Sequence, residues 1–224
     1  MAAQELDMRR LPLYSVTQAA HIVVTPPSTL RNWARGSVSK NIDGEQRVVD
    51  ALITTTGTGR GPVIPFVGLG EAYVLAAFRA AGVPMQRIRP ALARLDKEFG
   101  LHQALASERL MTDGAEVLYQ YSVEDTPELG ELVVVRNGQG VFNEVVKRYL
   151  KTITYRDGFI ASIVLPQFGP RIVVSPTRNF GQPTHSATGV PIRAVQDRLS
   201  AGEPADDLAA DYGIPVDDVV ALAA

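Results

Sequence analysis

Residues 14–36, YSVTQAAHIVVTPPSTLRNWARG, decide how the start of the chain folds. The apolar residues in the segment 19–24 predict a short helix, with Thr17 before them as its N-cap. The pair Pro26 and Pro27 ends this helix, because a proline disfavours the α region in the residue before it. The first helix therefore stops at a tight turn.

A second helix follows this turn, with Ser28 as its cap and with Leu30 and Trp33 facing inward. Its outer face carries hydroxyl, amide and guanidinium groups, which are the groups that reach phosphates and base edges in DNA. Two short helices and a polar outer face are typical of a helix-turn-helix, although a plain helical hairpin with solvated arginines has the same spacing. The DNA-binding residues expected on this helix are Ser28, Thr29, Arg31, Asn32 and Arg35.

Residues 37–61 are polar and rich in glycine, with a strand-like core at 47–54. This core can pair with Val63 and Ile64 across the glycine-rich turn, which predicts a two-stranded wing. Arg47 and Arg60 would lie on the wing and contact the flanking phosphates of DNA. A plain loop with two solvated arginines is the alternative.

Two further helices are expected after the wing. Residues 68–81, GLGEAYVLAAFRAA, form an apolar helical run. Residues 85–88 read as a short turn, and Pro90 suits the first position of a helix over 90–99.

The order of helix pair, wing and second helix pair resembles the MerR-type DNA-binding head over about residues 13–99. Six residues match the pattern of its recognition helix, namely Ser28, Thr29, Leu30, Arg31, Trp33 and Gly36. The resemblance implies a winged helix-turn-helix over residues 1–99 that reads operator DNA. A symmetric operator requires two heads, hence a homodimer. MerR regulators continue into a long dimerising helix, and the chain departs from that pattern at Gly100.

Residues 100–175 favour a small antiparallel sheet with a helix. Asp113-Gly114 and Asp157-Gly158 are hairpin signals of the two-residue type. Short strands are expected at 132–135 and 170–174, and an amphipathic helix at 141–150.

Residues 176–224 open with a loop rich in proline, glycine, asparagine and threonine. Three short helices are then predicted, at 192–199, 206–212 and 216–223, because glycines and prolines punctuate the segment. The fold class is therefore α+β with several domains, the last of them a three-helix domain. This segment is similar to a small trihelical domain of unknown function found in many toxin–antitoxin operons, and the matching residues are Gly181, Pro183, Gly189, Pro191, Gly202, Leu208, Tyr212, Asp218 and Val219.

The charge of the chain is nearly balanced, with 22 Lys and Arg against 24 Asp and Glu, so any DNA site must be a local patch. The last 50 residues are acidic and would repel phosphates, which favours a protein partner, although a solvated acidic cap is the alternative. Without cysteine, disulfides are excluded and the chain fits a reducing cytoplasm. No apolar run reaches the length of a membrane span.

No constellation of acid, base and nucleophile is visible, so no catalytic residue is expected and an enzyme is the least supported class. The three histidines are scattered and have no ligand-like partners at helical spacing, so no metal site and no cofactor are expected.

Taken together, the chain resembles a VapB-type antitoxin. The resemblance implies a protein that represses its own operon through operator DNA and neutralises a PIN-like ribonuclease toxin. The toxin-binding residues expected in the last third of the chain are Arg171, Arg178, Arg193, Asp206, Asp207 and Tyr212. Two other classes stay open: a stand-alone MerR-like regulator that senses a small ligand in its C-terminal half, and an adaptor whose head docks onto proteins.

Overall fold

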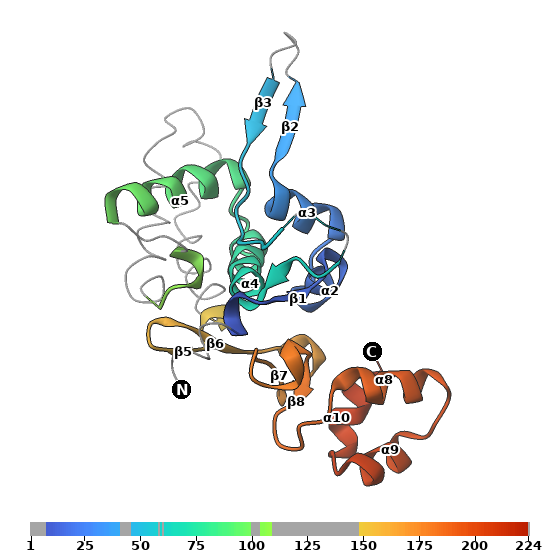
Figure 1. The fold of residues 1–224 in the computed structure, drawn as a ribbon. Helices are drawn as coiled ribbons and strands as arrows, with labels where there is room; N and C mark the ends of the chain where they lie inside the picture. The colour runs from blue at the N-terminus through green and yellow to red at the C-terminus, as the bar shows by residue number, and fades with distance from the viewer. Residues whose placement is uncertain are drawn as a thin grey trace. The chain divides into compact units, whose positions relative to one another are not determined.

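The computed structural model of the 224-residue chain describes residues 8–40, 46–57, 59, 61–99, 104–108 and 148–223. Its contacts divide the chain into two compact units, each with helices and short strands (Figure 1). The head unit comprises Arg10–Lys151 and Tyr155–Ile160, and the tail unit comprises Met1–Arg9, Thr152–Thr154 and Ala161–Ala224. No helix in the described part of the chain combines the length and the apolar character needed to cross a membrane.

The head unit contains helices and two small antiparallel sheets. The helices are α2 (Val16–Ile22), α3 (Pro27–Arg35), α4 (Phe66–Ala80), α5 (Met85–Phe99) and the short 3₁₀ helix η1 (Ala104–Ala106). One sheet pairs β1 (Pro12–Tyr14) with β4 (Ile64–Pro65), and the other pairs β2 (Ser37–Lys40) with β3 (Gln46–Val49).

The two helix caps at the start of the chain differ from the prediction. Helix α2 is capped by Ser15 and not by Thr17: the Ser15 hydroxyl accepts a hydrogen bond from the Gln18 backbone N–H, and the Gln18 side chain accepts one from the Ser15 N–H. This reciprocal pair satisfies two backbone donors at once. Helix α3 has Pro26 as its N-cap, so Ser28 lies inside the first turn and makes no capping bond.

Helix α4 supplies the core of the head unit and lies where the sequence predicts a helix. Its buried side chains include Phe66, Leu69 and Phe78, and it packs against β1, β4 and η1 (Figure 1). The predicted turn at 85–88 is wrong, because α5 already begins at Met85 and Pro90 lies inside it. Ile88 is buried, and its packing stabilises the first turn of α5. This stabilisation offsets the helical hydrogen bond that Pro90 cannot donate.

The predicted pairing of the wing is also wrong. Strand β3 pairs with β2, in the register Val38 opposite Val48, and Figure 1 shows the two strands running side by side from the end of α3. Ile53 and Val63 are buried instead of forming a strand ladder. Their apolar side chains belong to the core of the head unit, and a single hairpin cannot offer them that burial.

A four-stranded sheet has the strand order β5-β6-β7-β8, and its strands β7 and β8 belong to the tail unit. These strands are β5 (Ile153–Arg156), β6 (Phe159–Val164), β7 (Ile172–Val174) and β8 (Thr184–His185), with the 3₁₀ turns η3 (Pro166–Phe168) and η4 (Asn179–Gly181) between them. The predicted hairpin turn at Asp157-Gly158 is confirmed, with φ values of 54° and 78°. Positive φ at both central residues is the conformation that an Asp-Gly pair favours.

Three short helices complete the tail unit where the sequence predicts helices. They are α8 (Ile192–Ser200), α9 (Ala205–Tyr212) and α10 (Val216–Ala221). The hairpin expected at Asp113-Gly114, the strand expected at 132–135 and most of the helix expected at 141–150 lie outside the described residues.

Candidate DNA-binding surface and tail loop

Helices α2 and α3 are joined by a tight turn with a left-handed residue. Val24 has a φ of 51°, and the Thr25 N–H donates to the Ala20 carbonyl at 2.9 Å. Leu30 and Trp33, predicted to face inward, are both buried. The two helices therefore form a helix-turn-helix whose inner face is closed by apolar packing.

The outer face of α3 gathers four of the predicted DNA-binding side chains. Ser28, Arg31, Asn32 and Arg35 are exposed, and Thr29 is half-buried. Residues at spacings of three and four share one face of a helix. Arg31, Asn32 and Arg35 thus place two guanidinium groups and one amide on the same side of the helix.

The β2–β3 hairpin continues directly from α3 through Gly36. Gly36 has a φ of 70°, and a Cβ at this position would lie 2.2 Å from the Val49 carbonyl oxygen. Only glycine fits such a junction. Arg47 lies in β3 opposite Ser39, two residues nearer the tip of the hairpin than Val49, which pairs with Ser37 beside the end of α3.

A second segment reaches the end of α3 from the glycine-rich turn. The Arg35 guanidinium donates to the Gly59 carbonyl at 3.2 Å. Arg35 is therefore held in place by the loop that the sequence assigns to the wing. Arg60 itself lies outside the described residues.

The segment between the hairpin and α4 is fixed by a buried carboxyl group. Glu71 accepts hydrogen bonds from the backbone N–H and the hydroxyl of Thr54, the latter at 3.1 Å. Burial raises the pKa of Glu71 to about 7, against the lowering effect of both hydrogen bonds. Arg89 of α5 donates to the Asp50 carbonyl at 2.6 Å, which ties the same segment to a second helix.

In the tail unit, Arg171 is engaged within the fold. Its guanidinium donates to the Asp218 carboxylate at 2.6 Å, and the buried His185 Nε2 lies 3.1 Å from the same oxygen. His185 Nδ1 accepts from the Thr188 N–H, so the hydrogen on Nε2 donates to Asp218. Burial alone would raise the pKa of Asp218, but these partners outweigh it and hold that pKa below its usual value.

Tyr212 is also covered by an intramolecular partner. The Arg198 guanidinium lies over its ring, 5.3 Å from the centroid, and donates to the Glu203 and Asp211 carboxylates. This network joins α8 to α9. Arg171 and Tyr212 thus stabilise the tail unit itself.

Three other expected toxin-binding side chains lie on the helices of the tail unit. Arg193 is 78% exposed on α8, where it pairs loosely with Asp197 at 3.7 Å. Asp206 and Asp207 are exposed in the first turn of α9, where acidic groups suit the positive end of a helix.

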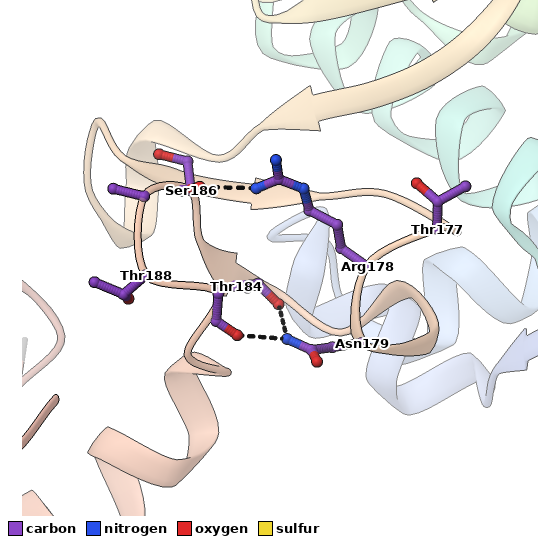
Figure 2. Close-up of a pocket in the computed structure, with 8 residues that line it drawn as sticks. Thr177, Arg178, Asn179, Thr184, Ser186 and Thr188 are labelled. Carbon is purple, nitrogen blue, oxygen red and sulfur yellow. Dashed lines mark hydrogen bonds between the residues drawn. The ribbon is translucent and has the colours of Figure 1, made fainter.

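Arg178 lies at a polar hollow of about 430 Å³ on the surface of the tail unit (Figure 2). Its guanidinium donates to the Ser186 carbonyl at 2.8 Å. The Asn179 amide donates to the Thr184 hydroxyl at 3.0 Å and to the Gly189 carbonyl at 2.8 Å. These bonds tie the loop between β7 and β8 to β8 and to the segment that follows it.

Two features of the tail unit were not predicted from the sequence. One is the Arg171–Asp218–His185 cluster, whose partners are up to 47 residues apart. The other is the turn at Asn179-Phe180-Gly181, where all three residues have positive φ. The Asn and Gly of this turn were its only local signal. No group of three His, Asp or Glu side chains among the described residues is arranged to hold a metal ion.

Two family descriptions match separate parts of the chain. Residues 12–92 match a family described as "Putative DNA-binding HTH domain", which covers α2, α3 and the hairpin. Residues 172–224 match a family described as "Protein of unknown function (DUF433)", which covers β7, β8 and the three tail helices.

Similar proteins of Mycobacterium tuberculosis match nearly the whole chain. A crystal structure of Rv2018 shares 37% identity and a TM-score of 0.76, covering 95% of this chain and 97% of that chain. The uncharacterized protein Rv2308 is 25% identical over 222 residues, 92% of this chain and 87% of that protein. A protein named "Putative antitoxin VapB45" is 43% identical over 229 residues, 96% of this chain and 95% of its own length. With this identity along its whole length and a helix-turn-helix at its start, the chain belongs to the VapB45 antitoxin family.

Proposed function

We propose that this protein is the antitoxin of a type II toxin–antitoxin pair. The head unit binds the operator of its own operon, and the tail unit holds and neutralises a PIN-like ribonuclease toxin in the cytoplasm. The protein acts without catalysis or a cofactor. Family membership supports the antitoxin role, and the exposed polar face of α3 is the observation that carries the DNA-binding role.

The DNA-binding part of the proposal rests on size and chemistry. A helix of nine residues is about 13 Å long and fits the major groove of B-DNA. Arg31 and Asn32 are the base-reading residues, because guanidinium and amide groups pair bidentately with guanine and adenine. Phosphate contacts fall to Ser28, Thr29, Arg35, Arg47 and Arg60.

Two copies of the chain bind a symmetric operator, with their α3 helices about 34 Å apart or a multiple of that distance. The active form is therefore a homodimer.

Fluorescence anisotropy tests the DNA-binding part on a duplex taken from upstream of the gene. Arg31→Ala and Asn32→Ala each weaken binding to this duplex by about 1–3 kcal/mol, and weaken binding to a scrambled duplex less. Arg193→Ala removes one exposed charge from the tail unit and serves as the matched control. Equal losses on both duplexes would make Arg31 and Asn32 phosphate contacts and not readers of bases.

The toxin-binding part is supported by the charge of the tail unit. Six acidic side chains of the segment 192–223 lie at the surface (Asp197, Glu203, Asp206, Asp207, Asp211, Asp217), against two basic ones (Arg193, Arg198), while Asp218 is buried and paired with Arg171. Such a surface repels phosphates and suits a basic protein. A ribonuclease is a protein of this kind, because its substrate is a polyanion.

Co-expression with the neighbouring reading frame tests the toxin-binding part. A stable complex and restored growth are the expected results. DNA binding without any such complex would favour a stand-alone regulator instead.

A further inference from the structure

We infer that Phe180 and Arg178 form the anchor by which the tail unit binds its toxin. The Phe180 ring enters an apolar pocket of the partner, and Arg178 pairs with a carboxylate at the edge of that pocket. This inference rests on the proposed function, since the partner is the toxin.

Phe180 is the most exposed large apolar residue in the described part of the chain, at 79%. An exposed phenyl ring contributes almost nothing to the folding of its own unit, because its apolar surface stays in water. A binding partner that covers the ring would recover this contribution. Figure 2 shows the adjacent side chains of Arg178 and Asn179 pointing back to the loop, where they form hydrogen bonds.

The loop that presents Phe180 is rigid and strained. Asn179 and Phe180 have φ values of 44° and 51°, a region that residues with a Cβ seldom occupy. Such a conformation persists where surrounding bonds impose it. Here the Asn179 amide binds Thr184 and Gly189, and the Thr184 hydroxyl binds the Gln182 carbonyl at 2.7 Å. The backbone that carries the ring is thus held before binding, so little backbone conformational entropy is lost when the ring is covered.

Arg178 provides a charged contact beside the ring. Its bond to Ser186 uses one of its five N–H groups. No carboxylate among the described residues pairs with it, whereas Arg171 and Arg193 each have one and Arg198 has two. The hollow next to Arg178 is lined by polar side chains, and the Ser186 hydroxyl among them can also donate to a carboxylate. Aromatic and arginine side chains are enriched among the residues that dominate binding energy at protein interfaces.

The charge of the tail unit favours a protein over a nucleic acid as the partner. A phenyl ring and an arginine could also hold a base and a phosphate, but the acidic helices α8–α10 would repel a polyanion. The matching surface is basic overall and has a carboxylate next to an apolar pocket. A ribonuclease that binds metal ions through carboxylates within a cationic groove has this chemistry.

The test is the Kd between the full-length chain and the purified product of the neighbouring reading frame, measured by titration calorimetry. Phe180→Ala weakens the complex by at least about 30-fold, and Arg178→Gln by about tenfold. Val220→Ala is the matched control, since Val220 is 54% exposed on α10 in the same unit. This control variant stays within about threefold of the wild type.

A second variant separates binding from folding. Phe180→Gly removes the ring and also relieves the left-handed strain, so it melts no lower than the wild type and yet binds as weakly as Phe180→Ala. Binding of both variants within threefold of the wild type overturns the inference and leaves the proposed function standing. If the wild-type chain does not bind the product at all, both the inference and the proposed toxin-binding function are overturned. Weaker binding to single-stranded RNA with an unchanged protein complex would make Phe180 a stacking group for bases, which also overturns the inference.

Discussion

At the scale of single residues, Glu71 links the proposed DNA-binding surface to the core. It lies in α4 and accepts two hydrogen bonds from Thr54, in the segment that leads away from the hairpin. Burial raises its pKa to about 7 from a usual value of 4.5. The folded state therefore binds the proton more tightly than the unfolded state does, and the stability that this provides is complete below pH 4.5 and is lost as the pH rises to about 7.

Glu71→Gln should remove this pH dependence. The free energy of unfolding of the wild type should fall relative to that of the variant by up to about 1.4 kcal/mol per pH unit between pH 4.5 and 7. Glutamine keeps an acceptor for the Thr54 N–H, so the variant should still fold. Urea denaturation at pH 5, 6, 7 and 8 measures the difference. A constant difference across this range would show that Glu71 does not change its protonation on folding.

At the scale of elements, the junction between α3 and β2 depends on Gly36. Gly36→Ala places a Cβ 2.2 Å from the Val49 carbonyl oxygen, in a conformation with a φ of 70°. Gly82 is a matched control, because its φ is 83° but a Cβ there meets nothing within 4 Å. Gly82→Ala should cost about 1–2 kcal/mol for the left-handed backbone alone. Gly36→Ala should lower the free energy of unfolding by at least about 1 kcal/mol more than Gly82→Ala, as measured by thermal or urea unfolding. Similar losses for the two variants would show that the hairpin backbone does not lie against Gly36.

Local signals predict elements well, and their partners poorly. Pro26-Pro27 and Asp157-Gly158 fix a turn by their own backbone preferences, so α3 and the β5–β6 turn could be predicted from the sequence. The partner of β3 could not be predicted in this way. Apolar residues such as Ile53 and Val63 can belong either to a strand pair or to a core, and the folded chain buries them in the core. The exposed face of α3 was accessible to the same reasoning. The contact of Arg171 with Asp218 was not, since no local rule joins residues so far apart.

At the scale of the whole molecule, each unit has its own buried core, with Leu30 and Phe66 in the head and Leu208 and Val219 in the tail. If DNA binding and toxin binding belong to different units, core substitutions should separate them. Each truncation of a buried leucine to alanine removes about 2–5 kcal/mol of stability.

Leu30→Ala should abolish operator binding and keep the toxin complex, because Leu30 is fully buried beneath the outer face of α3. Leu208→Ala in α9 should have the opposite effect, with toxin binding lost and operator binding kept. Anisotropy on operator DNA and calorimetry with the toxin, both at a temperature where the wild type is folded, measure the two activities. Each variant is the control for the other, since both lose the same side chain from a fully buried site. Loss of both activities in either variant would mean that the two units depend on each other to fold, and the division of labour between head and tail would have to be abandoned.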